Sequence, residues 1–101
     1  MKLSLAQIKA MFVVGDKWQA IRDSEAVVIH GNTDNTLCPS EHKEEVRTVA
    51  KVMSNQIRFL RPNGMDIYTP LPKASEVLEA SQGFVKIAYE GMGVVVALTK
   101  I

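Results

Sequence analysis

The chain has 101 residues, 47% of them hydrophobic and 23% charged, and a formal net charge of +1 at pH 7. This composition is typical of one globular domain and excludes a largely disordered chain. The near-neutral charge excludes a strong overall attraction to nucleic acid or acidic membranes, so any such binding requires a local patch. Apolar runs such as Ala26–Ile29 and Gly93–Leu98 are far shorter than the roughly 20 residues of a membrane-spanning helix.

The N-terminal region predicts one short helix. Ser4 and Gln7 have the spacing of a capping box, and the apolar residues between Leu5 and Phe12 recur at helical intervals. We therefore expect a helix over about residues 5–12. A helix of this length is stable only when its apolar face docks on the rest of the domain.

Two strands and a polar segment follow the helix. Lys17–Arg22 and Glu25–His30 predict strands, and Trp18 in the first of them is expected in the core. Residues 31–44 are rich in asparagine, aspartate, serine and proline, which favour turns. The pattern predicts a long polar surface loop there.

The clearest hairpin joins Val46–Met53 to Gln56–Leu60 through a two-residue turn at Ser54–Asn55. Both arms alternate in one common register, which places Lys51 opposite Arg58. In this register the predicted core face carries Thr48, Ala50, Val52, Ile57 and Phe59.

The remaining elements are short and closely spaced. Pro62–Gly64 is a turn that leads into a strand over Met65–Thr69, and Lys73–Leu78 fits one helical turn. Phe84–Tyr89 and Val94–Thr99 form a last hairpin.

One short helix, six or seven strands and many turns predict a single, mainly β domain over residues 1–101, with hairpins at about 46–69 and 84–99. No helix is long enough for a crossover, which favours a small SH3-like barrel or a strongly bent antiparallel sheet. The run Val94–Leu98 allows a homodimer if it forms an edge strand.

Basic side chains are the leading candidates for a binding surface. Lys51 and Arg58 oppose each other on the predicted solvent face, Arg47 projects from the same face four residues earlier, and Arg61 follows nearby. Like charges facing each other across a ladder destabilise it, which a bound anion or acidic partner offsets. These four residues form the predicted basic face.

A metal or thiolate site is a weaker prediction. Cys38 and His42 are separated by three intervening residues, and His30 lies nearby in the sequence. Zinc, however, requires three or four ligands on a rigid frame, and no second Cys or His pair is present. The single cysteine excludes an intrachain disulfide and suits a reducing cytosol.

No catalytic constellation and no cofactor site is predicted. Glu41, Glu44 and Glu45 alternate with Lys43 and Arg47, which is typical of a solvated, self-compensating segment. The glycines at positions 91 and 93 lie between two strands, where a hairpin turn explains them better than a phosphate loop.

One pattern of short motifs spans the second half of the chain: Arg47–Val52 followed by Ser54–Asn55, then Pro72–Val77, then Gly83–Phe84. In this pattern the chain resembles a group of small uncharacterised proteins of bacteriophages and prophages, and the resemblance covers Val46 to Tyr89. No catalytic motif accompanies it. The resemblance implies a phage context, in which small proteins commonly bind a host or phage macromolecule.

We therefore expect a non-catalytic binding module that occupies the surface of a host or phage protein in the bacterial cytoplasm. Two alternatives stay open. One is a nucleic-acid-binding domain that uses the basic face, and the other is a small metal-binding protein or enzyme built on Cys38 and His42. Lys2 is not followed by a continuous apolar core or by a small-residue cleavage site, so we expect no signal peptide.

Overall fold

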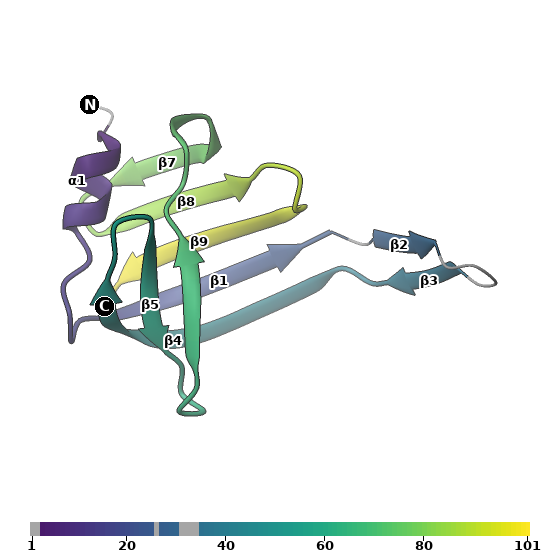
Figure 1. Cartoon of the computed structure of the whole chain (residues 1–101), viewed down its shortest axis with the longest axis horizontal. Helices are drawn as coiled ribbons and strands as arrows, with labels where there is room; N and C mark the ends of the chain where they lie inside the picture. The colour runs from purple at the N-terminus through teal and green to yellow at the C-terminus, as the bar shows by residue number, and fades with distance from the viewer. Residues whose placement is uncertain (1–2, 26, 31–34) are drawn as a thin grey trace.

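The computed structural model describes residues 3–25, 27–30 and 35–101, and for residues 27–30 and 35–38 it describes the backbone. Figure 1 shows a short helix at one end of a bent sheet and a two-stranded ribbon that projects from the other end. In chain order the elements are α1 (Leu5–Ala10), β1 (Lys17–Ser24), β2 (Val27–His30), β3 (Asn35–Cys38), β4 (Glu41–Val52), β5 (Gln56–Leu60), β6 (Asp66–Pro70), the 3-10 turn η1 (Ala74–Glu76), β7 (Val77–Ser81), β8 (Phe84–Tyr89) and β9 (Val94–Lys100).

Seven strands form one antiparallel sheet in the order β6-β5-β4-β1-β9-β8-β7, and β2 pairs with β3. The prediction of a mainly β fold with one short helix is confirmed, and the sheet is strongly bent. It is not closed into a barrel: β6 and β7 are its two edges in the part of the chain that the structure describes. The condition set for a homodimer through Val94–Leu98 is not met, because β9 is no edge strand and lies inside the sheet between β1 and β8.

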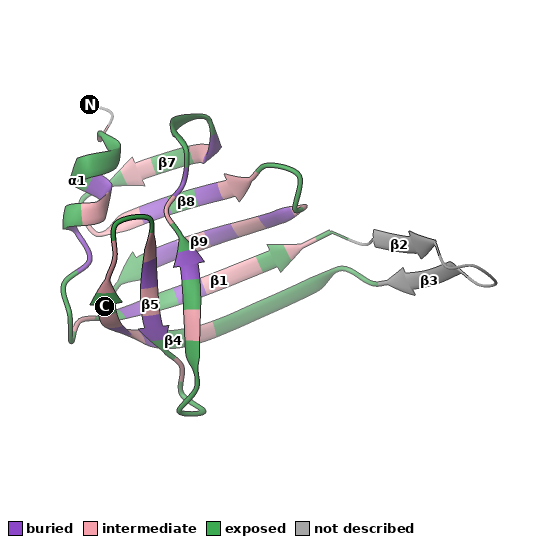
Figure 2. Cartoon of the chain, in the orientation of Figure 1, coloured by how far each residue is buried: buried purple, intermediate pink, exposed green. Residues whose placement is uncertain are grey.

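The core lies where α1 and the β5–β6 hairpin cover one face of the sheet. Ser4 and Gln7 form the predicted capping box, and the helix ends at Ala10, two residues earlier than expected. Phe12 stacks on the fully buried Trp18 with ring centroids 4.5 Å apart. In Figure 2 buried residues occur along β1, β5, β8 and β9, whereas the part of β4 nearest β3 is exposed. We call this covered side the concave face.

The β4–β5 hairpin follows the predicted register only next to its turn. Lys51 pairs with Arg58 as predicted, but the register then shifts at Ala50, so that Val49 faces Phe59. A β-bulge of this kind leaves one residue unpaired and reverses the inward and outward alternation beyond it. The predicted core face is therefore wrong beyond the bulge: Val49 is buried, whereas Thr48 and Ala50 are only partly buried.

The predicted polar loop over residues 31–44 is also wrong for the residues that the structure describes. Residues 35–38 form β3, and β4 begins at Glu41, where it pairs with Ser24 of β1. Backbone pairing with β1 extends β4 through a charged sequence that has little intrinsic strand preference. Residues 31–34 lie outside the described chain.

Residues 73–78 form less helix than expected. The turn η1 covers three residues, and the chain then enters β7. The Glu76 carboxylate accepts hydrogen bonds of 2.8 Å from the backbone N–H groups of Lys73 and Glu90. These two bonds lower the pKa of Glu76 and join the turn to the end of β8.

Among the described residues, no helix combines the length and the hydrophobicity needed to cross a bilayer.

Candidate functional site

A cavity of about 270 Å³ opens on the concave face between β6 and strands β1, β4, β8 and β9. Arg22 and Arg47 are its two charged lining residues, and we call it the arginine pocket. Its apolar lining includes Ile67, Tyr89, Met92, Val94 and Val96. The pocket therefore combines cationic groups with an apolar wall, and a site for an amphipathic anion requires both.

Strand register places the two arginines. Arg22 pairs with Val96 of β9, and Arg47 pairs with the buried Trp18 of β1. Paired residues of an antiparallel sheet point to the same side, so both arginines project from the concave face. The β5–β6 hairpin folds over this face, and four consecutive residues of β6, 67–70, form the opposite wall of the pocket.

Glu45 lies between two arginines beside the pocket. Arg47 donates from Nε to Glu45 Oε1 at 2.6 Å, and Arg61 donates from Nε to the same oxygen at 3.0 Å. The side chain of Arg47 is only 7% exposed and that of Glu45 is 19% exposed. Burial alone raises the pKa of Glu45, but the hydrogen bonds and charges of the two arginines outweigh it, and the pKa lies below its ordinary value.

The concave face carries an excess of positive charge around the pocket. Glu45 is shared by Arg47 and Arg61, and Arg22 forms no ion pair with any other residue that the structure describes. An arginine has five N–H donors, and among the described residues Arg47 donates one of them, from Nε, to Glu45. Donors are therefore available for a second carboxylate.

Tyr89 closes one end of the pocket. Its hydroxyl donates a hydrogen bond of 2.6 Å to the carbonyl oxygen of Pro70, the last residue of β6. Burial, with a smaller contribution from the charge of Glu76, raises the pKa of Tyr89 to about 12. The phenol is therefore a neutral donor at physiological pH and joins the free edge of the sheet to β8.

The predicted basic face is divided between two sides of the sheet. Lys51 and Arg58 oppose each other on the outer side, as predicted. Arg47 lies on the concave face and is buried, because the bulge at Ala50 reverses its direction, and Arg61 is bonded to Glu45. The expectation that all four residues share one face is therefore wrong.

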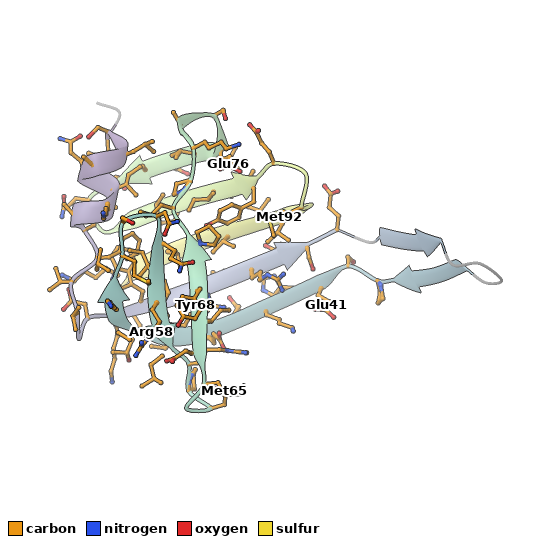
Figure 3. All side chains as sticks on the ribbon, viewed as in Figure 1. Glu41, Arg58, Met65, Tyr68, Glu76 and Met92 are labelled. Carbon is orange, nitrogen blue, oxygen red and sulfur yellow. The ribbon has the colours of Figure 1, made fainter. Side chains whose placement is uncertain are left out.

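Only part of the predicted basic face remains on the outer side of the sheet. Lys51, Arg58 and Tyr68 pair in sequence across β4, β5 and β6. Tyr68 is 50% exposed and, at the edge of the sheet, also borders the arginine pocket. Figure 3 shows Arg58 and Tyr68 on these neighbouring strands. The Nε of Arg58 is 3.6 Å from an oxygen of Asp66, too long for a hydrogen bond. We call these three residues the outer row.

The residues considered for metal binding do not form a described site. His42 hydrogen-bonds through Nδ1 to Asp23, and this bond, with the charge of Asp23, raises the pKa of His42. The side chains of Cys38 and His30 lie outside the described part of the structure. Among the side chains that it describes, no group of three or more histidine, cysteine, aspartate or glutamate residues could hold a metal ion.

Two residues of the arginine pocket were absent from the sequence prediction. Arg22 shares the alternation of Trp18 and Ala20, two buried residues, and this pattern could have placed it on the core side. Tyr89 gave no comparable signal, because its partner Pro70 is 19 residues away along the chain. Comparisons of the chain with protein-family models, with curated proteins and with solved structures find no match.

Proposed function

We propose that the protein is a non-catalytic binding module whose arginine pocket accepts an acidic segment of a protein partner. The observation that carries this proposal is the pair Arg22 and Arg47 in an otherwise mostly apolar cavity. Arginine is suited to this role because its planar guanidinium binds carboxylates with two parallel hydrogen bonds.

The position of the pocket favours a protein segment over a small molecule. The pocket lies at the lower end of the volumes typical of ligand sites and is bounded by the edge strand β6, to which a further chain can add. A segment of a larger partner can place one side chain in the pocket and make its other contacts outside. The similarity to phage proteins supports a partner of host or phage origin in the bacterial cytoplasm.

Selection from a phage-displayed random peptide library tests the proposal. The wild-type protein and Arg22→Glu are used as baits, and Lys86→Glu is the matched control because Lys86 is exposed on β8 and its neighbours Val85 and Ile87 point into the core. We expect peptides with carboxylate and apolar residues to be enriched on wild type and on the control, and lost on Arg22→Glu. Equal enrichment on all three baits, or none on wild type, contradicts the proposal.

A second candidate function, nucleic-acid binding, is favoured by the outer row. Two cations and an exposed aromatic ring in line across three strands match the way that single-stranded nucleic acid is held, by phosphate contacts and base stacking. Lys51 forms no ion pair with another described residue, and Arg58 is only loosely compensated by Asp66.

A mobility-shift titration with single-stranded DNA and RNA at low and high salt tests this candidate. The double variant Lys51→Glu and Arg58→Glu should abolish a salt-dependent shift, because the electrostatic contacts are lost. The matched control, Lys17→Glu with Lys86→Glu, changes the net charge equally at exposed positions elsewhere. Equal loss of binding in both double variants would assign the shift to overall charge and remove the outer row as a site.

A further inference from the structure

We propose that the arginine pocket recognises the free C-terminus of its partner: the arginines bind the terminal carboxylate, and the apolar wall receives the last side chain. This inference rests on the proposed function and specifies the partner as a chain that ends in an apolar residue. Its basis is the chemistry of the pocket together with the free edge of β6.

A ligand of this pocket has to present both a negative charge and an apolar group within the space of about one residue. The pocket's charged groups are Arg22 and Arg47, and its wall includes three branched aliphatic residues, Ile67, Val94 and Val96. An internal glutamate supplies a carboxylate but leaves this wall poorly filled, because its side chain has only two methylene groups. A terminal leucine or valine supplies a carboxylate and an apolar side chain from one residue, and its α-carboxyl group is ionised at neutral pH.

The free edge of β6 provides contacts for the residues that precede the C-terminus. Among the described strands β6 pairs only with β5, so alternate backbone N–H and C=O groups face away from the sheet. A peptide that adds to such an edge forms a further strand, and its side chains then enter neighbouring pockets. Residues 67–70 of β6 line the arginine pocket, so an added strand passes directly beside it.

The geometry of β6 also indicates the direction of the added strand. Ile67 pairs with Phe59, which pairs with Val49, and Arg47 is two residues before Val49 on the same side of β4. Arg47 is therefore nearer to the Ile67 end of β6 than to its Pro70 end. An antiparallel added chain ends at this side, with its carboxylate beside Arg47.

The opposite end of β6 limits how long the added strand can be. The carbonyl group of Pro70 is already bonded to the Tyr89 hydroxyl, and a proline has no N–H to donate. Pairing is therefore confined to the residues before Pro70. This predicts recognition of a short tail, two to four residues long by the length of β6 before Pro70.

The test uses N-terminally fluorescein-labelled hexapeptide pools with random internal positions. Pools ending in leucine or glycine are each made with a free carboxylate and with a C-terminal amide, and binding is followed by fluorescence anisotropy. On wild type we expect the free-acid leucine pool to bind about tenfold tighter or more than its amide, as expected for the loss of a charge-assisted pair. It should also bind more tightly than the free-acid glycine pool.

Variants assign the effect to the pocket. In Arg22→Gln the difference between acid and amide should shrink to less than about twofold, whereas Lys86→Gln should retain the wild-type ratio. Arg22 is preferred to Arg47 as the site of substitution because Arg47 also holds Glu45 in the fold. Thermal unfolding of each variant confirms that it is folded.

The outcomes separate this inference from the proposed function. C-terminal recognition is overturned if the acid and amide pools bind equally well. The proposed function still stands in that case if a peptide with an internal acidic residue binds wild type and does not bind Arg22→Glu. An unchanged acid preference in Arg22→Gln assigns the carboxylate to another part of the surface and also overturns C-terminal recognition by the pocket. Failure of every peptide to bind, including those from the random library, overturns both.

Discussion

Replacing Glu45 by glutamine tests whether this carboxylate compensates the buried charge of Arg47. The substitution preserves the shape of the side chain and removes its charge, so that Arg47, 7% exposed, loses its recorded ion-pair partner. Removing one member of a buried ion pair costs about 3–5 kcal/mol. The Arg61 bond adds less than about 1 kcal/mol, because that side chain is 33% exposed and screened by water.

The glutamine amide recovers part of this cost. Its oxygen still accepts a hydrogen bond from Arg47, which contributes about 1 kcal/mol. We therefore expect Glu45→Gln to lower the free energy of unfolding by about 2–4 kcal/mol. For a domain of this size, such a loss lowers the melting temperature on the order of 10–30 °C.

Urea unfolding followed by the fluorescence of Trp18 measures the effect, since this ring is fully buried in the folded state. Glu44→Gln is the matched control, because Glu44 is exposed and lies 3.7 Å from His42. The control should change stability by less than about 0.5 kcal/mol. Equal effects of the two substitutions would refute the view that Glu45 compensates a buried charge.

The pH dependence gives a second measurement on the same variant. The pKa of Glu45 is lower in the folded chain than its ordinary value of 4.5, so its stabilising contribution is fully present above that value. The contribution is lost as the pH falls through the folded pKa. The stability difference between wild type and Glu45→Gln should therefore decrease in acid, and a difference that grows on acidification contradicts the assignment.

Three further predictions follow from other contacts. Phe59→Ala should lower the free energy of unfolding by about 3–5 kcal/mol, since this ring is 0% exposed and packs edge-on against Phe12; urea unfolding measures it, and a loss below about 1 kcal/mol contradicts the core position. Tyr89→Phe should remove a phenol titration near pH 12 and cost about 1 kcal/mol; ultraviolet absorbance measures the first, and a titration unchanged by the substitution refutes the assignment. Asp23→Asn should lower the pKa of His42 toward its ordinary value of 6.5, as measured by NMR, and an unchanged pKa argues against the bond. In wild type, the stability that this pair contributes is fully present below pH 6.5 and is lost as the pH rises through the folded pKa.

Local signals in the sequence predicted much of the fold. The capping box at Ser4 and Gln7 forms as predicted, and the pairing of Lys51 with Arg58 follows from alternation on both arms of one hairpin. These features depend on residues close together in the chain. Propensity, capping and turn chemistry act at that range, so a single sequence is sufficient to find them.

Features that depend on distant residues were not predicted. The bulge at Ala50 could not be predicted from the alternation of apolar and polar residues, because each part of the hairpin, before and after Ala50, alternates regularly by itself. The first residues of β4 resemble a solvated loop, and only their pairing with β1 makes them a strand. The arginine pocket is a tertiary feature of the same kind, since it brings Arg22 and Tyr89 together from strands far apart in the sequence.

The unpaired residue at Ala50 determines which side of the sheet each cation occupies. By turning Arg47 inward while Lys51 stays outside, it distributes guanidinium and ammonium groups over the front and the back of a single layer. A ligand in the arginine pocket would therefore leave the Lys51 side chain, on the opposite side, uncovered. Deleting Ala50 would join Val49 directly to Lys51 and keep both on their present sides, so the strand would lose its local kink and the cations would stay apart.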